Sequence, residues 1–266
     1  MSEDRLFRYF ITWLGWAAML FLVFPVVLTV VVSFSGSQFI EFPPKSLSVD
    51  WYTNIAKINK IGEATLLSLL IAALTGLLTV AMAIPAALAL ARYDFPCKGA
   101  ISAFLLSPVA VPMIAIGIAI LQFFIWTGLP FNWLTLLVGH MVLVSAYPVR
   151  TLIASLTLSN PSLEEAAASL GASRWTVFRT VTLSQLTPGL ISGFLFAFLI
   201  SFDNYPISIF LVRSGLTTMP IEVFNYISQQ LDPTPAAFST IYIIIVSAII
   251  IFAERRFGVI SLSVKG

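Results

Sequence analysis

Long stretches without any charged side chain constrain this chain more than any other feature of its sequence. These stretches are 9–40, 64–91, 99–149, 180–202 and 233–253. A helix needs about 20 apolar residues to cross the hydrocarbon core of a bilayer. The stretch 99–149 is long enough for two crossings, and TGLPFN at 127–132 within it has the glycine, proline and asparagine of a turn. The sequence therefore predicts six membrane spans.

We expect the spans to be helices, because a helix satisfies its backbone hydrogen bonds within one segment and can cross lipid without a partner strand. Their approximate bounds are 10–34, 64–91, 99–126, 132–157, 186–212 and 236–254. The composition agrees, since 59% of the 266 residues are hydrophobic and 10% are charged, against about 25% charged in soluble domains. The predicted fold class is an all-α membrane protein, with residues 1–266 forming a single transmembrane domain.

The positive charges predict the orientation of the chain, because Lys and Arg are enriched in cytoplasmic loops. A cytoplasmic N-terminus would place ten of them in the cytoplasm: Arg5, Arg8, Arg92, Lys98, Arg150, Arg174, Arg179, Arg255, Arg256 and Lys265. Four would lie on the opposite side: Lys45, Lys57, Lys60 and Arg213. Both termini are therefore expected to be cytoplasmic.

A single cysteine, Cys97, and a single histidine, His140, provide neither an intramolecular disulfide nor a Cys/His cluster for a metal ion. His140 stands alone in the fourth expected span, where such a residue more often hydrogen-bonds a neighbouring helix than holds a ligand. Prolines mark places where a span could break. Those inside or close to the expected spans are Pro25, Pro85, Pro108, Pro112, Pro148 and Pro206.

The segment 160–183 places an amphipathic, alanine-rich sequence between two of the expected spans. Its apolar side chains recur with helical spacing at Leu163, Ala166, Ala167 and Leu170. A helix that lies in the lipid headgroups usually has a basic polar face, whereas this one carries Glu164 and Glu165 and no Lys or Arg. We therefore favour a surface that docks a cytoplasmic partner over a helix that rests on the membrane.

The ends of this short helix are marked by local chemistry. Asn160 can cap it with proline in the first helical position, or Ser162 and Glu165 can form a capping box; the sequence leaves both open. Gly171 can adopt the left-handed conformation that stops the helix, and Ser173 can cap the next one. The segment is therefore predicted to be a folded helix-turn-helix.

Part of this segment resembles the EAA loop of permease subunits of binding-protein-dependent ABC importers. The residues that carry the resemblance are, in order, Glu165, Ala166, Ala167, Gly171, Phe178, Val181 and Leu183. In that family the loop forms the coupling helix, which sits in a groove of the ATPase subunit. The family usually has isoleucine at the position of Val181 and proline at that of Ser184. The resemblance implies the type I ABC importer permease fold, with 160–183 as the cytoplasmic coupling loop. The predicted coupling residues are Glu165, Ala166, Ala167, Gly171 and Arg174.

The resemblance also implies the assembly and its place in the cell. Its members work in the bacterial cytoplasmic (inner) membrane with two cytoplasmic ABC ATPase subunits, a second permease subunit that is often a related heterodimer partner, and a periplasmic or extracellular solute-binding protein. No G-x-x-x-x-G-K-[ST] loop occurs in this chain. We therefore expect no enzyme activity, catalytic residue or cofactor in it, with ATP and Mg²⁺ bound by the partner ATPase. Besides these subunits the expected partner is membrane lipid, and not nucleic acid.

The segments 201–210 and 217–240 resemble spermidine/putrescine-type permeases most closely, although similar permeases carry ferric iron or opines. Asp203 lies in an otherwise uncharged span, and a carboxylate at mid-membrane costs about 2.5–3.5 kcal/mol, so it should face a cavity or a partner. A cationic amine would suit it. The predicted substrate pathway consists of Phe202, Asp203, Asn204, Tyr205 and Ser208. The alternative is a structural carboxylate that caps a broken helix or pairs with Arg213.

Two other classes of function share some of these features. An ion-coupled secondary transporter usually has duplicated halves and several ionisable groups within the membrane, whereas Asp203 is nearly alone in this chain. A membrane scaffold could recruit a cytoplasmic enzyme through 160–183 without any transport. The preferred hypothesis is an importer permease that forms half of the translocation pathway and works by alternating access.

Overall fold

The computed structural model describes residues 3–58, 60–213 and 215–257, with side chains from residue 6 onwards. Within these ranges nearly all regular structure is helical, apart from isolated bridges between Ser35 and Leu47 and between Arg213 and Leu216. The predicted all-α class is therefore confirmed.

The helices have the following bounds. In chain order they are α1 (Glu3–Ser33), α2 (Asp50–Asn54), the 3₁₀ turn η1 (Ile55–Lys57), α3 (Ile61–Arg92), α4 (Lys98–Leu106), the 3₁₀ turn η2 (Ser107–Val109), α5 (Met113–Thr127), α6 (Trp133–Val144), α7 (Ala146–Leu158), α8 (Pro161–Ser169), α9 (Arg174–Val177), the π-helical turn η3 (Phe178–Thr182), α10 (Leu183–Phe202), α11 (Tyr205–Leu211), α12 (Met219–Gln229) and α13 (Thr234–Phe257).

Four continuous helical segments in the described part of the chain are long and apolar enough to cross a membrane: Leu6–Ser33, Ile61–Arg92, Arg174–Phe202 and Thr234–Arg256. Two further candidates are bent pairs of helices. The pair α4–η2 and α5 bends by 103°, and the pair α6 and α7 bends by 41°. The number of spans reaches the predicted six when each bent pair counts as one crossing.

The structure corrects three of the expected helices. The helix expected over 99–126 is interrupted at Ser107–Pro112, where Pro108 and Pro112 lack the N–H groups that a continuous helix would use. The helix expected over 132–157 bends at Ser145, three residues before Pro148. The helix expected over 186–212 begins earlier and ends at Phe202, because the extended backbone of Asn204 starts a new helix, α11.

Residues of the chain group into two compact units. The first is drawn from Met1–Ile61 and Val223–Ile249, and the second from Gly62–Glu222 and Ile250–Gly266. In the first unit, Asn54 Nδ2 donates to the Tyr226 hydroxyl (3.1 Å) and to Thr234 Oγ1 (2.9 Å). The Tyr226 hydroxyl donates to Asp232 Oδ2 at 2.7 Å. These bonds join α2 to α12 and to the start of α13.

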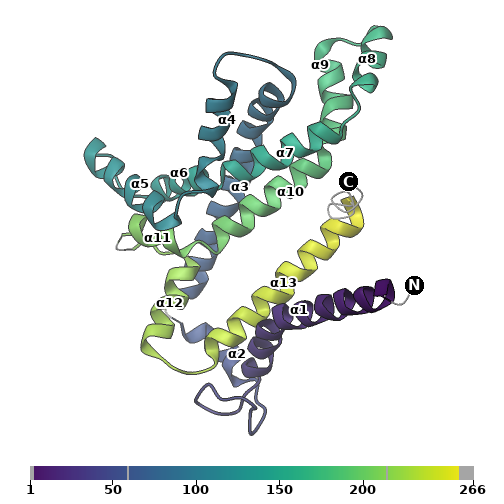
Figure 1. Cartoon of the computed structure of the whole chain (residues 1–266). Helices are drawn as coiled ribbons and strands as arrows, with labels where there is room; N and C mark the ends of the chain where they lie inside the picture. Colours follow the sequence, from purple (N-terminus) through teal and green to yellow (C-terminus); the bar gives the residue numbers. More distant parts are fainter. Residues whose placement is uncertain (1–2, 59, 214, 258–266) are drawn as a thin grey trace. The chain divides into compact units, whose positions relative to one another are not determined.

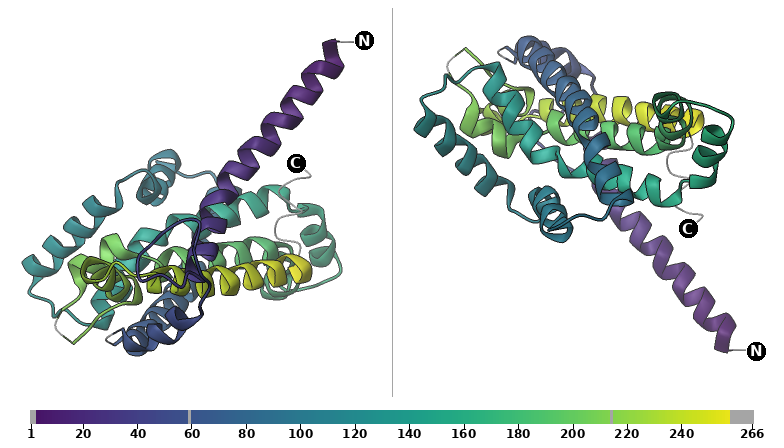
Figure 2. Two further views of the ribbon diagram at one scale, coloured as in Figure 1. Left: turned by 90° about the horizontal axis from the view of Figure 1, so that it is seen from below. Right: turned by 90° about the horizontal axis from the view of Figure 1, so that it is seen from above.

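The second unit has two apolar clusters along α10. One includes Leu152 and Leu186 near the start of α10, and the other includes Leu136 and Ile207 near its end. The turn from α8 to α9 lies at the opposite end of this unit from α5 and α11, as the views agree (Figures 1 and 2). The helix α10 therefore runs between the predicted coupling loop and the predicted pathway residues.

Close packing of α7 on α10 depends on two glycines, and the two helices run side by side in Figure 1. A methyl group on Gly189 would lie 2.8 Å from Ser155 Cβ and 3.0 Å from the Thr151 carbonyl oxygen. A methyl group on Gly193 would lie 2.8 Å from Thr151 Oγ1 and 3.1 Å from Pro148 Cα. Thr151 Oγ1 also donates to the Gly189 carbonyl at 3.1 Å. This G-x-x-x-G spacing lets the two backbones approach, as small residues do in membrane helix pairs.

Candidate functional site

The loop 160–183 folds as the helix-turn-helix that the sequence predicts, and the structure decides between the two possible caps of α8. The Asn160 side chain accepts a hydrogen bond from the Ser162 backbone N–H at 3.1 Å, and Pro161 is the first helical residue. The Asn160 N–H donates to Gln185 Oε1 at 2.8 Å, which ties the start of α8 to α10.

The turn between α8 and α9 requires a left-handed residue. Gly171 has φ +87°, a conformation that costs a residue with a side chain roughly 1–2 kcal/mol. The Gly171 N–H donates to the Ala168 carbonyl (2.9 Å) and the Ala172 N–H to the Ala167 carbonyl (3.1 Å), which satisfies the last carbonyl groups of α8. Ser173 then caps α9 by accepting from the Thr176 N–H at 3.2 Å. Both predicted roles, of Gly171 and of Ser173, are confirmed.

The apolar stripe of α8 faces outward within its unit. Leu163 is 52% exposed, Leu170 is 89% exposed and Ala166 is exposed, whereas Ala167 is half-buried. Trp175, at the start of α9, is also exposed and lies against the Phe178 ring with centroids 5.5 Å apart. Large apolar side chains that gather on an exposed surface are typical of a protein–protein contact.

The two acidic residues of α8 have different surroundings. Glu165 is exposed, as is Arg174, so both predicted coupling charges lie on the surface. Glu164 is half-buried and forms a two-pronged ion pair with Arg92, at the end of α3. These hydrogen bonds from Arg92 hold the pKa of Glu164 below its ordinary value, although partial burial opposes the shift. The sequence contains only a weak signal for this pair, an arginine in the last turn of a span and a glutamate in the first turn of α8.

The second part of the candidate site is the break between α10 and α11. The Asp203 N–H donates to the Leu199 carbonyl at 3.2 Å and ends α10, and the Asp203 side chain is exposed. Asn204 caps α11, since its Oδ1 accepts from the Ile207 N–H at 2.9 Å. The structural alternatives for Asp203 were that it caps a broken helix or pairs with Arg213. The helix is broken here, with Asn204 as the cap of α11. The Arg213 guanidinium lies over the Phe131 ring, 3.9 Å from its centroid.

The structure distributes the five predicted pathway residues over both sides of this break. Phe202, Asn204 and Ser208 are buried, Tyr205 is half-buried and Asp203 is exposed. The sequence predicted a continuous helix here and gave a break only as an alternative, and it did not show that three of the five side chains point into the packed interior.

His140 holds the break together from α6. Its Nε2 lies 3.0 Å from Ser208 Oγ and its Nδ1 lies 2.8 Å from Ser201 Oγ. Because Ser208 Oγ donates its own hydrogen to the Asn204 carbonyl at 2.6 Å, it accepts from Nε2–H. His140 thus joins α6 to α10 and α11, as expected of a histidine alone in a span.

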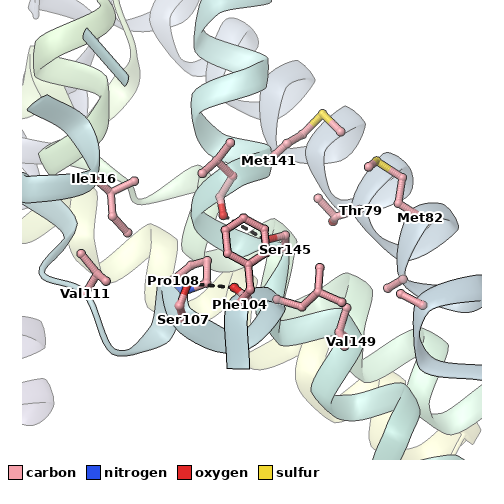
Figure 3. Close-up of a pocket in the computed structure, with 14 residues that line it drawn as sticks. Thr79, Met82, Phe104, Ser107, Pro108, Val111, Ile116, Met141, Ser145 and Val149 are labelled. Atoms are coloured by element: carbon pink, nitrogen blue, oxygen red, sulfur yellow. Dashed lines mark hydrogen bonds between the residues drawn. The ribbon is translucent and has the colours of Figure 1, made fainter. Parts of the chain in front are cut away.

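An apolar cavity of about 470 Å³ lies where α4–η2 bends away from α5 (Figure 3). Met82 from α3, Phe104 from α4 and Met141 from α6 project into it. Its lining residues are uncharged, and none of the predicted pathway residues is among them. This cavity is therefore separate from the break at Asp203.

The family of this chain follows from comparison with known proteins. Residues 81–260 match the family described as the inner membrane component of binding-protein-dependent transport systems. The chain belongs to this family and is a multi-pass inner-membrane permease component of an ABC importer.

Two relatives are similar over most of their length. This chain is 27% identical to the spermidine/putrescine transport system permease protein PotC of Haemophilus influenzae over 234 residues, 88% of this chain and 91% of that protein. It is 29% identical to the putrescine transport system permease protein PotI of Escherichia coli over 228 residues, 83% of this chain and 81% of that protein.

The fold is also similar to that of a solved structure, a bacterial ABC transporter involved in the import of the acidic polysaccharide alginate. The TM-score is 0.72 at 15% sequence identity, and the match covers 97% of this chain and 98% of that chain. This similarity supports the type I permease fold. The family also decides against the secondary-transporter hypothesis.

Proposed function

We propose that this chain forms half of the pathway of an importer for a small cationic amine of the polyamine class, such as putrescine or spermidine. Two observations support this substrate class. The relatives PotC and PotI are named for these solutes and align with more than four fifths of this chain. Asp203 is a carboxylate at the end of α10 that remains exposed, and it can attract an ammonium group, with Tyr205 beside it as an aromatic surface for cation–π contact.

Coupling to ATP hydrolysis rests on the exposed apolar face of α8. Leu163, Ala166 and Leu170 lie outward on a short helix with capped ends, and Glu165 and Arg174 add charges that can set the register of docking. In this proposal α8 docks on a cytoplasmic ABC ATPase, which binds ATP and Mg²⁺. Two such ATPases, a second and related permease subunit and an extracytoplasmic solute-binding protein complete the importer. Both termini then lie on the cytoplasmic side with α8.

The experiment for coupling compares two glycines with the same backbone conformation. Gly171 (φ +87°) lies in the turn after α8, and Gly128 (φ +68°) ends α5; a methyl group would meet no atom within 4 Å at either one. We expect the ATPase to co-purify with the tagged wild-type chain and with Gly128→Ala from native membranes in mild detergent, and to be depleted in Gly171→Ala. Equal ATPase in both variants would contradict docking through this turn.

Substrate binding is tested with Asp203→Asn. We expect this variant to keep its ATPase and to lose uptake of labelled putrescine or spermidine in vesicles that contain the whole importer and its binding protein. Asp94→Asn is the control, because Asp94 is an exposed carboxylate in a loop on the predicted cytoplasmic side. Normal amine uptake by Asp203→Asn would reject Asp203 as a binding group, and uptake of ferric iron alone would reject the amine.

A further inference from the structure

The ion pair between Arg92 and Glu164 joins two elements that are 72 residues apart in the chain. Arg92 is the last residue of α3, and Glu164 lies in the first turn of α8. Arg92 Nη1 lies 2.5 Å from Glu164 Oε2, and Arg92 Nη2 lies 2.7 Å from Oε1. The helix dipole favours both charges, since the positive Arg92 lies at the C-terminus of α3 and the negative Glu164 lies at the N-terminus of α8. The planar guanidinium can bond both carboxylate oxygens at once.

A third donor completes the arrangement. Thr182 Oγ1 donates to Glu164 Oε1 at 2.8 Å, and Thr182 is buried at the end of the π-helical turn η3, which leads directly into α10. The Glu164 carboxylate therefore accepts hydrogen bonds from the end of α3 and from the base of α10 together. We call Arg92, Glu164 and Thr182 the clamp.

Glu165 shows that the clamp is a property of one position on α8. It follows Glu164 by one residue, which is a rotation of about 100° around the helix, and its side chain is exposed. Glu164 is thus bound within the chain, whereas Glu165, which lines the same groove, stays accessible to another protein. A partner that binds the exposed Leu163 and Leu170 can pull on α8 without competing for the clamp.

A groove of about 420 Å³ lies beside the ion pair. Leu88 and Arg92 of α3 line it on one side, and Glu164 and Ala168 of α8 on the other. Because open space remains between these parts of α3 and α8, the ion pair, rather than continuous apolar packing, connects them here. A displacement of α8 would reach α3 through these charged groups.

From these contacts we propose that the clamp transmits movement of α8 to α3 and α10 together, so that Arg92 and Glu164 are positioning residues of ATP-driven transport. This inference rests on the proposed function, in which α8 docks on the ATPase. If the clamp is lost, α8 still carries its outer docking face, but its movement is no longer delivered to α3. ATP hydrolysis should then continue while transport per ATP falls.

The test uses the complete importer, with its ATPases and binding protein, in proteoliposomes. We expect Glu164→Gln and Arg92→Gln to retain the ATPase and its hydrolysis, and to transport about ten-fold fewer amine molecules per ATP, the factor expected for loss of a charge-assisted hydrogen bond. Asp94→Asn is the control for loss of one negative charge near the end of α3, because Asp94 is an exposed carboxylate in the loop after α3 and belongs to neither proposed site.

Two substitutions of Thr182 test the hydrogen bond that its hydroxyl donates to Glu164. Thr182→Val removes the hydroxyl at nearly constant volume, and Thr182→Ser keeps it, so only the valine variant should lower transport per ATP. A wild-type ratio in both Glu164→Gln and Arg92→Gln would overturn the clamp. Absence of any ATPase from the wild-type preparation would instead overturn the proposed function on which the clamp rests.

Discussion

The contact between α7 and α10 makes a quantitative prediction for Gly189→Ala. The new methyl group would lie 2.8 Å from Ser155 Cβ and 3.0 Å from the Thr151 carbonyl oxygen, and neither atom can move away by a change of rotamer. Overpacking of this kind costs about 1–3 kcal/mol, and the better helix propensity of alanine returns about 0.5–1 kcal/mol. At the middle of both ranges we expect a net loss of about 1 kcal/mol, which lowers Tm by about 2–4 °C in a chain of this size.

The assay is thermal unfolding of the purified protein in one detergent, followed by fluorescence. Gly99→Ala is the control, because Gly99 lies in α4 and its added methyl group would meet no atom within 4 Å; its Tm should stay the same or rise. The double variant Gly189→Ala with Ser155→Gly removes the Ser155 side chain from the new methyl group, so its loss of Tm should be smaller than the sum of the two single losses. Equal Tm values for Gly189→Ala and Gly99→Ala would refute the close approach of α7 and α10.

Three further predictions concern other contacts. His140→Leu removes both hydrogen bonds across the break and should destabilise the chain by about 0.6–1.7 kcal/mol, whereas His140→Asn should lower Tm less; equal losses would show that only packing matters there. Asn160→Ala removes a cap worth about 1 kcal/mol, so amide exchange in the first turn of α8 should accelerate about five-fold, and unchanged exchange would contradict the cap. Because the pKa of Glu164 is lowered, its ion pair contributes stability above the ordinary value of 4.5 and loses it as pH falls through the lowered value. The Tm difference between wild type and Glu164→Gln should therefore be constant from about pH 6 to 8 and shrink below about pH 4.5, and a difference that persists in acid would contradict the ionised pair.

Features encoded in adjacent residues could be predicted from the sequence. The charge-free stretches identify the apolar helices, and the turns at Gly128 and Gly171 follow from glycine at positions that need positive φ. The cap at Ser173 follows in the same way from a side-chain acceptor just before a helix, and Asn160 was one of the two caps that the sequence allowed for α8. Each of these depends on interactions within a few residues, which is why the sequence pattern was sufficient.

Features that depend on tertiary contacts could not be predicted in the same way. Proline alone does not decide where a span breaks, since Pro25 and Pro85 lie within continuous helices whereas Pro108 and Pro112 flank a bend of 103°. The pairing of Arg92 with Glu164 across 72 residues needs the packed fold.

The break at Asn204 did have a local signal. Asn204 is followed by Tyr205 and Pro206, which is the order of a capping residue and an early helical proline. The surrounding apolar run concealed it, because apolar residues continue on both sides at the spacing of a single span. A search for caps inside apolar stretches, and not only at their ends, would have found the start of α11.

The continuous segment from Arg174 to Phe202 has a consequence for how its length can vary. At about 1.5 Å per residue its 29 residues extend about 43 Å, and each residue adds about 100° of rotation. One residue inserted in its α-helical part would turn Asp203 by about 100° relative to α8, so this segment should accept substitutions far more readily than insertions. The π-helical turn at Phe178–Thr182 is the exception, because such a turn is an α-helix with one extra residue. A deletion there would restore a regular α-helix and leave both ends in phase.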